Sequence, residues 1–165
     1  MSADVAPLDA GSAVGGAPVQ LLTLRAPIGG VIVPLERVPD PTFAERLAGD
    51  GLAIDPLDDR LVAPCEGRVL QVHRAGHAVT LEVCGVELLL HIGLDTVQLR
   101  GEGFTPLAKA GDVVRGGDPL IAFDADLIAR RARSLLTLVL LTGGERVVDV
   151  RAATGGRVRA GEDVV

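Results

Sequence analysis

The chain has 165 residues and a formal net charge of −6, and 48% of its residues are apolar although only three are aromatic. An acidic chain lacks the basic surface that nucleic acids require, and no run of about eighteen apolar residues is present to cross a bilayer. We therefore expect neither nucleic-acid binding nor direct membrane insertion. The two cysteines, Cys65 and Cys84, have no metal-ligand spacing, which favours ordinary strand or core residues in the reducing cytoplasm.

Residues 1–19 are rich in Ala, Gly, Ser, Pro and Asp without apolar periodicity, which predicts a disordered N-terminal tail. From residue 20 to residue 165 we expect one domain, in which short apolar runs alternate with Gly and Pro. Such runs predict an all-β fold, an antiparallel β-sandwich or barrel. The expected strands cover 30–35, 52–54, 68–72, 78–83, 86–91, 119–123, 137–141 and 146–150.

Two short helical stretches interrupt this pattern. Residues 42–48 follow Pro41, with Asp40 in the position of an N-cap. Residues 126–133 follow Asp124 and predict one or two helical turns. The fold is therefore expected to be β-rich with little helix.

Two histidines, His77 and His91, flank a tight turn predicted at Cys84 and Gly85. A three-residue loop from Val83 to Gly85 would place the two imidazoles opposite one another, with Cβ atoms about 4.5–5.5 Å apart. A two-residue loop would place them on opposite faces of the sheet. We expect the three-residue loop, so that the two side chains meet.

A pair of facing imidazoles has few uses. It can bind a metal together with a third ligand, it can act as a nucleophile with a helper, or the two histidines can be unrelated. Spacing alone favours the unrelated pair. The residues that follow His91 favour phosphoryl chemistry, because the backbone at Gly93 can approach a phosphoryl group and Asp95 can orient a ring or a partner.

The segment around His91 resembles the active-site signature of the glucose-type enzyme IIA of the bacterial sugar phosphotransferase system. The resemblance covers roughly residues 22–165 in the right order. The matching residues are Gly85-x-x-Leu88-Leu89-Leu90-His91-Ile92-Gly93-Leu94-Asp95-Thr96-Val97, with Val38 to Glu45, Gly49 to Pro56, Gly76-His77-Ala78 and Gly111 to Val114.

The resemblance implies an antiparallel β-sandwich that takes a phosphoryl group from the histidine phosphocarrier HPr onto Nε2 of His91. It implies transfer to a cysteine on the IIB domain of a sugar permease, with His77 assisting. Gly93 and Asp95 match site-lining positions, while Phe43, Leu47 and Asp40 match a partner-docking rim. No cofactor is required, although zinc held by His77, His91 and a partner carboxylate is known among such proteins. A monomer in the cytoplasm is expected.

Departures and alternatives remain. Some relatives have a threonine that supports the first histidine where this chain has Ala75, and His73 matches no family role and is predicted to be a surface strand residue. A mainly regulatory protein, which binds transporters or kinases under the control of His91 phosphorylation, is the second hypothesis. A zinc hydrolase is a third, and it would need three protein ligands where only two histidines cluster.

Overall fold

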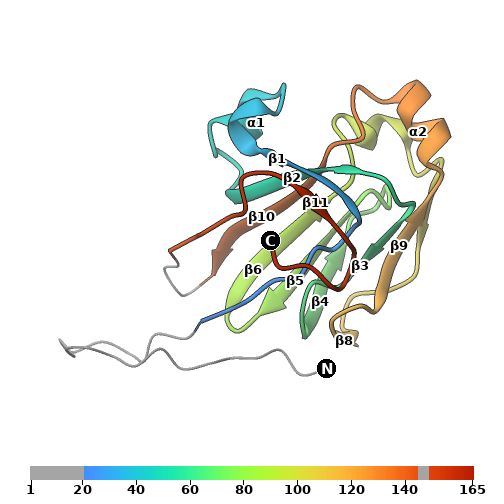
Figure 1. Cartoon of the computed structure of the whole chain (residues 1–165). Coiled ribbons are helices and arrows are strands. Elements are labelled where there is room, and N and C mark those ends of the chain that lie inside the picture. Colours follow the sequence, from blue (N-terminus) through green and yellow to red (C-terminus); the bar gives the residue numbers. More distant parts are fainter. Residues whose placement is uncertain (1–20, 145–148) are drawn as a thin grey trace, which may run out of the picture.

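The computed structural model describes residues 21–144 and 149–165; the tail predicted over residues 1–19 lies outside these residues, as does most of the strand predicted over 146–150. The described residues form two antiparallel sheets, which confirms the predicted all-β class (Figure 1). The eight-stranded sheet has the order β11-β1-β2-β10-β6-β5-β4-β8, and the three-stranded sheet has the order β3-β9-β7. The strands are β1 (Gly30–Pro34), β2 (Asp50–Pro56), β3 (Arg60–Val62), β4 (Gly67–Val72), β5 (Ala78–Val83), β6 (Val86–His91), β7 (Phe104–Pro106), β8 (Val113–Val114), β9 (Pro119–Phe123), β10 (Thr137–Gly144) and β11 (Arg157–Val158).

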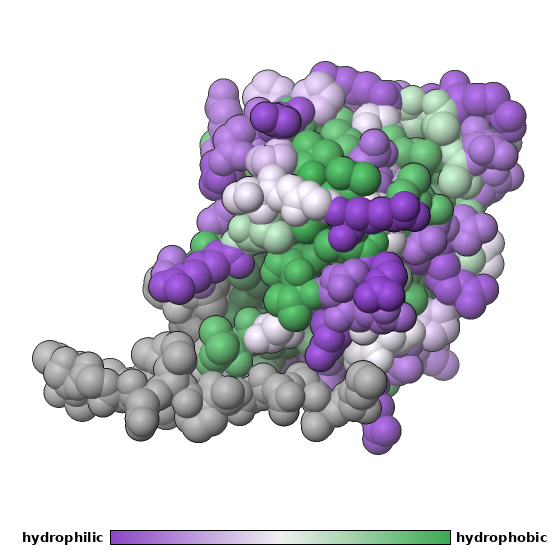
Figure 2. Space-filling view, viewed as in Figure 1, coloured by the Kyte–Doolittle hydropathy of each residue, from purple (hydrophilic) through white to green (hydrophobic). Residues whose placement is uncertain are grey.

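The large sheet is apolar on both faces, because alternate residues of its central strands join two separate clusters. Val139 of β10 packs into the main core, whereas its neighbours Leu138 and Leu140 pack into a smaller cluster on the opposite face. The main core also contains Leu61 and Ile121 of the small sheet, so it lies between the two sheets. Apolar surface nevertheless remains visible across the centre of the face in Figure 2, as the aliphatic composition allows.

The helical elements are short. They are η1 (Leu35–Arg37), α1 (Pro41–Ala44), η2 (Thr96–Leu99) and α2 (Ala125–Arg131). The carboxylates of Asp40 and Asp124 cap α1 and α2 by accepting backbone N–H groups at 3.0 Å. α1 ends earlier than predicted because Arg46 adopts a left-handed φ of 57°, with its guanidinium paired to nearby carboxylates. In the described residues no helix is long and apolar enough to span a membrane.

Candidate functional site

The β5–β6 hairpin carries the histidine pair, and its turn differs from the prediction. Val83 pairs with Val86 and Ala78 pairs with His91, so the loop holds two residues and the predicted three-residue loop is wrong. Cys84 and Gly85 both have left-handed φ angles, of 51° and 79°. This geometry matches the twist of the two strands, which is why two-residue hairpins favour it.

The two imidazoles nevertheless touch, by a diagonal contact. The ring centroids of His77 and His91 are 4.8 Å apart, at an interplanar angle of 79°. β5 begins only at Ala78, and Gly76 bends the chain with a φ of 73°. The side chain of His77 is therefore free of the strict alternation that holds within a strand.

The ring of His91 has a defined tautomer. Its Nδ1 lies 2.9 Å from the carbonyl oxygen of Gly93. Because a carbonyl oxygen only accepts hydrogen bonds, Nδ1 must carry the proton and Nε2 must carry the free lone pair. Burial lowers the pKa of His91, and this outweighs the opposing effects of the Gly93 carbonyl and the Asp40 charge. At neutral pH His91 is therefore a neutral imidazole with Nε2 available as a nucleophile.

His77 is more deeply buried than His91 and is held by rings. It is 5% exposed, and its Nδ1 has no hydrogen-bond partner among the described residues. The rings of His73, His91 and Phe104 surround it, with centroids 5.7, 4.8 and 6.4 Å away. Burial, with smaller contributions from the charges of His91 and His73, lowers the pKa of His77 to about 4. His73 is half-buried beyond the end of β4, so its prediction as a surface strand residue is wrong.

Gly93 forms the turn that holds His91. Its φ is 75°, and a Cβ atom there would lie 2.5 Å from Cγ2 of Thr96 and 2.7 Å from the carbonyl oxygen of Ser134. The Thr96 hydroxyl donates to the carbonyl of Ile92 at 2.6 Å and closes the same turn. Only glycine fits this backbone path, which aims the Gly93 carbonyl at the His91 ring.

Charged side chains form a rim around the pair. Asp95 has a left-handed φ of 59° at the start of η2 and is about half exposed. Asp40 and Asp95 lie 3.9 and 3.8 Å from Nη1 of Arg133. No local sequence pattern indicates a role for Arg133, because the residues it joins are far apart in the chain. The only indication in the sequence is an additional basic residue just after a helix.

Of the predicted docking residues, Phe43 and Asp40 lie near the His91 ring. The ring of Phe43 in α1 is half-buried, with its centroid 5.9 Å from that of His91. Leu47, just beyond α1, is 72% exposed, and Val97 in η2 is 56% exposed. The structure therefore places Phe43 beside the His91 ring, with exposed apolar side chains just beyond α1 and in η2.

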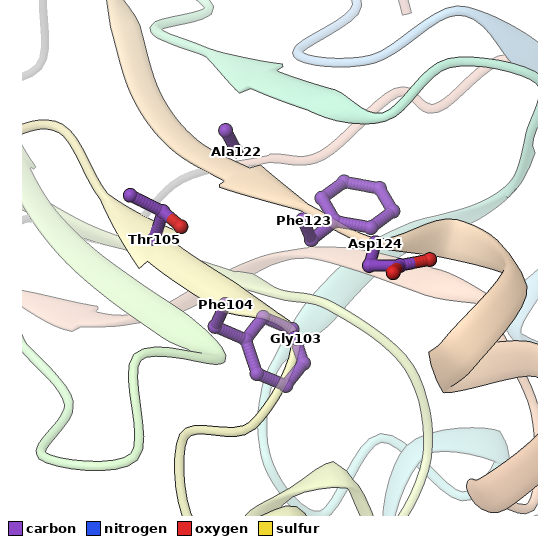
Figure 3. A pocket seen from close by; sticks show the side chains of 6 residues that line it. All are labelled: Gly103, Phe104, Thr105, Ala122, Phe123 and Asp124. Atoms are coloured by element: carbon purple, nitrogen blue, oxygen red, sulfur yellow. The ribbon is translucent and has the colours of Figure 1, made fainter.

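A hollow lies at the paired ends of β7 and β9, where Phe104 forms part of its lining. Figure 3 shows its lining, which is Gly103, Phe104, Thr105, Ala122, Phe123 and Asp124. Its one carboxylate, Asp124, already accepts a hydrogen bond at the start of α2. No histidine or cysteine lines this hollow, and the histidine pair remains the candidate site.

Known proteins match the chain along most of its length. A family profile described as phosphoenolpyruvate-dependent sugar phosphotransferase system, EIIA 1, matches residues 22–147. A protein named PTS system glucose-specific EIIA component from Halalkalibacterium halodurans is 44% identical over 140 residues, covering 84% of this chain and 81% of that protein. One of the same name from Haemophilus influenzae is 41% identical over 143 residues, 86% of each chain.

A solved structure agrees with the fold. The glucose permease IIA from Mycoplasma capricolum superposes with a TM-score of 0.78 at 36% identity, covering 87% of this chain and 93% of that one. The matched span includes the histidine pair, the Gly93 turn, and Asp40 and Asp95 of the charged rim. The chain therefore belongs to the EIIA 1 family of the phosphoenolpyruvate-dependent sugar phosphotransferase system.

Proposed function

We propose that the chain is a phosphocarrier whose His91 accepts a phosphoryl group from phospho-HPr and passes it to a cysteine of a IIB domain. The observation that carries this proposal is the hydrogen bond from Nδ1 of His91 to the Gly93 carbonyl, which leaves the Nε2 lone pair free. Family membership supports a role in the same phosphotransfer system.

In the first step the Nε2 lone pair of His91 forms a bond to phosphorus while the nitrogen–phosphorus bond in phospho-HPr breaks. The proton stays on Nδ1 of His91 and remains hydrogen-bonded to the Gly93 carbonyl, which stabilises the positive charge that develops on the ring. In the second step a cysteine thiolate of the IIB domain attacks the phosphorus, the bond to Nε2 breaks, and His91 returns to its neutral form. No proton is gained or lost in either step, because the attacking groups are an unprotonated nitrogen and a thiolate.

His77 is the proposed helper. Its pKa of about 4 keeps the ring neutral at physiological pH, so it can donate one N–H to a phosphoryl oxygen without bringing a charge into the buried site. The ring contact with His91, whose centroid lies 4.8 Å away, supports this role. Phosphoryl transfer depends mainly on such positioning and charge stabilisation.

Partners are proposed to dock on the rim formed by Phe43, Leu47, Asp40 and Asp95, with the chain acting as a cytoplasmic monomer. One docking face that serves both donor and acceptor suits a monomer that diffuses between them. The Phe43 ring, 5.9 Å from the His91 ring, also supports a regulatory role. A phosphoryl group on His91 would bring negative charge to the apolar docking face that Phe43 belongs to. Transporters or kinases that bind only the unphosphorylated form would be the targets.

The proposed phosphoryl transfer requires no cofactor, and zinc would bind only when other groups complete its site. Within the described residues no group of three His, Cys, Asp or Glu side chains is placed to hold a metal. His77 and His91 could supply two of the four ligands that zinc usually takes, so a partner carboxylate and water would have to complete the site. Because Nδ1 of His91 is engaged with Gly93, zinc would have to use Nε2.

The proposal is tested by incubating the purified chain with radiolabelled phosphoenolpyruvate, enzyme I and HPr. We expect a label that is labile in acid and stable in base, and its loss in His91→Gln. His77→Gln should still accept the label but release it slowly to a IIB domain. A label that persists in His91→Gln would overturn the assignment of the phosphorylated residue, and rapid onward transfer by His77→Gln would overturn the helper role.

A further inference from the structure

Arg133 joins the two acidic residues that flank the histidine pair. It lies two residues after the end of α2, and its Nη1 is 3.8 Å from Oδ2 of Asp95 and 3.9 Å from Oδ2 of Asp40. Its Nη2 donates to the backbone carbonyl of Pro39. In the part of the chain that the structure describes, no other cation pairs with either carboxylate.

These contacts hold the Arg133 guanidinium loosely and leave N–H donors of the group available. Both carboxylate distances exceed the roughly 2.7–3.2 Å of a protein hydrogen bond, so the two pairs are loose. A guanidinium has about five N–H donors, and among the described residues Arg133 donates one hydrogen bond, to Pro39. The side chain is also 48% exposed, so it has room to turn.

The backbone of Arg133 is fixed close to the His91 turn. Its neighbour Ser134 accepts a hydrogen bond from the N–H of Leu94 at 2.9 Å, and the same carbonyl lies against Gly93. The charge of Asp40, one of the two partners of Arg133, already acts on the His91 ring. The guanidinium is therefore paired with a carboxylate whose charge reaches the His91 ring, and its backbone lies against the turn that follows His91.

A phosphoryl group would create an electrostatic conflict there. It adds a charge of about −1.5 to −2 next to two carboxylates, and like charges at close range oppose one another. Arginine matches phosphate oxygens with parallel N–H donors better than lysine does. The only cation paired with this rim, within the described residues, is Arg133.

We propose that Arg133 is the exchangeable counter-ion of the phosphorylated state. It pairs loosely with Asp40 and Asp95 before transfer, and it turns its free N–H donors to the phosphoryl oxygens once His91 is phosphorylated. Arg133 thereby sets how strongly the chain holds the phosphoryl group relative to its donor. This inference rests on the proposed phosphorylation of His91.

The test measures the equilibrium constant for phosphoryl exchange between HPr and this chain, from the label on each protein at equilibrium. This constant compares the separate proteins, so a docking defect changes the rate but not its value. Arg133→Gln should lower it by about tenfold, the size expected for loss of a charge-assisted hydrogen bond. Arg133→Lys should give an intermediate value. Arg131→Gln, which removes the same charge from a residue paired with Glu102, should match the wild type.

A second variant changes the constant in the opposite direction. Asp95→Asn removes one competing carboxylate while keeping side-chain shape, and asparagine tolerates the left-handed φ of 59° found there. We expect the constant to rise. Two results would overturn this inference alone, provided that the wild type takes the label. One is the same equilibrium constant for Arg133→Gln and Arg131→Gln, and the other is a lower constant for Asp95→Asn than for the wild type. A wild type that takes no label from phospho-HPr would overturn the proposed function, and this inference with it.

Discussion

Lowering the pH from 7 to 5 should destabilise the fold through the buried ring of His77. The pKa of His77 is lowered from 6.5 to about 4, so the unfolded chain binds a proton in this range that the folded chain excludes. Stability from this group is present above the unfolded pKa and is lost as the pH falls towards the folded value. Linkage over these two pH units gives a loss of about 2 kcal/mol in the free energy of unfolding. His91, whose pKa is also lowered by burial, adds to the loss with the same sign.

Urea denaturation at pH 7 and pH 5 measures this loss, with His77→Phe as the comparison. Phenylalanine keeps a ring among the same neighbours and does not titrate, and Nδ1 has no hydrogen-bond partner to lose among the described residues. The variant should lose about 2 kcal/mol less than the wild type between the two pH values. The carboxyl groups with lowered pKa, Glu36 and Asp163, act at lower pH and disturb the comparison little. Equal losses in the two proteins would refute the assignment of a strongly lowered pKa to His77.

Three further changes should have separable effects. Gly93→Ala should lower the free energy of unfolding by at least about 2 kcal/mol in thermal unfolding, because the residue has a left-handed φ and its Cβ position is blocked. Gly143→Ala, with open space around it, should lower it less. Equal losses of stability would contradict the close fit at Gly93. Leu47→Asp should raise the KM for HPr about tenfold without lowering kcat. Leu57 is also a surface leucine but lies beyond the other end of β2, and Leu57→Asp should leave the KM unchanged. Equal KM values for the two variants would show that Leu47 does not belong to the docking rim. Zinc in excess should block labelling of His91 until a chelator is added, because Nε2 cannot hold both groups; undiminished labelling would exclude zinc from that nitrogen.

Local patterns account for most of what the sequence predicted of the fold. The bounds of β5 and β6 agree with the predicted runs 78–83 and 86–91, because apolar stretches between Gly-rich turns have few other conformations. The caps Asp40 and Asp124 depend on neighbouring residues alone. The two-residue strands β8 and β11 carry no pattern of their own, since they exist only through pairing with β4 and β1.

The hairpin register could not be read from the sequence with the same rules. The prediction of a three-residue loop depends on side-chain alternation that extends from His77 to His91. Alternation applies only inside a strand, and His77 lies one residue outside β5. Cysteine also gives little indication of the positive φ found at Cys84. Arg133 was missed because its partners Asp40 and Asp95 are brought to it only by the tertiary fold.

The place of β11 beside β1 bears on how the chain is made. β1 leaves the ribosome before every other strand that the structure describes, and its outer edge pairs with residues 157 and 158 of β11, the last of these strands. Ala26 and Asp163 are hydrogen-bonded at 2.7 Å in the same region, where the first and last strands run side by side (Figure 1). At translation rates of about 5–20 residues per second, the β1 edge stays unpaired for roughly ten seconds. During that interval the nascent chain exposes an apolar strand edge, a natural target for chaperones.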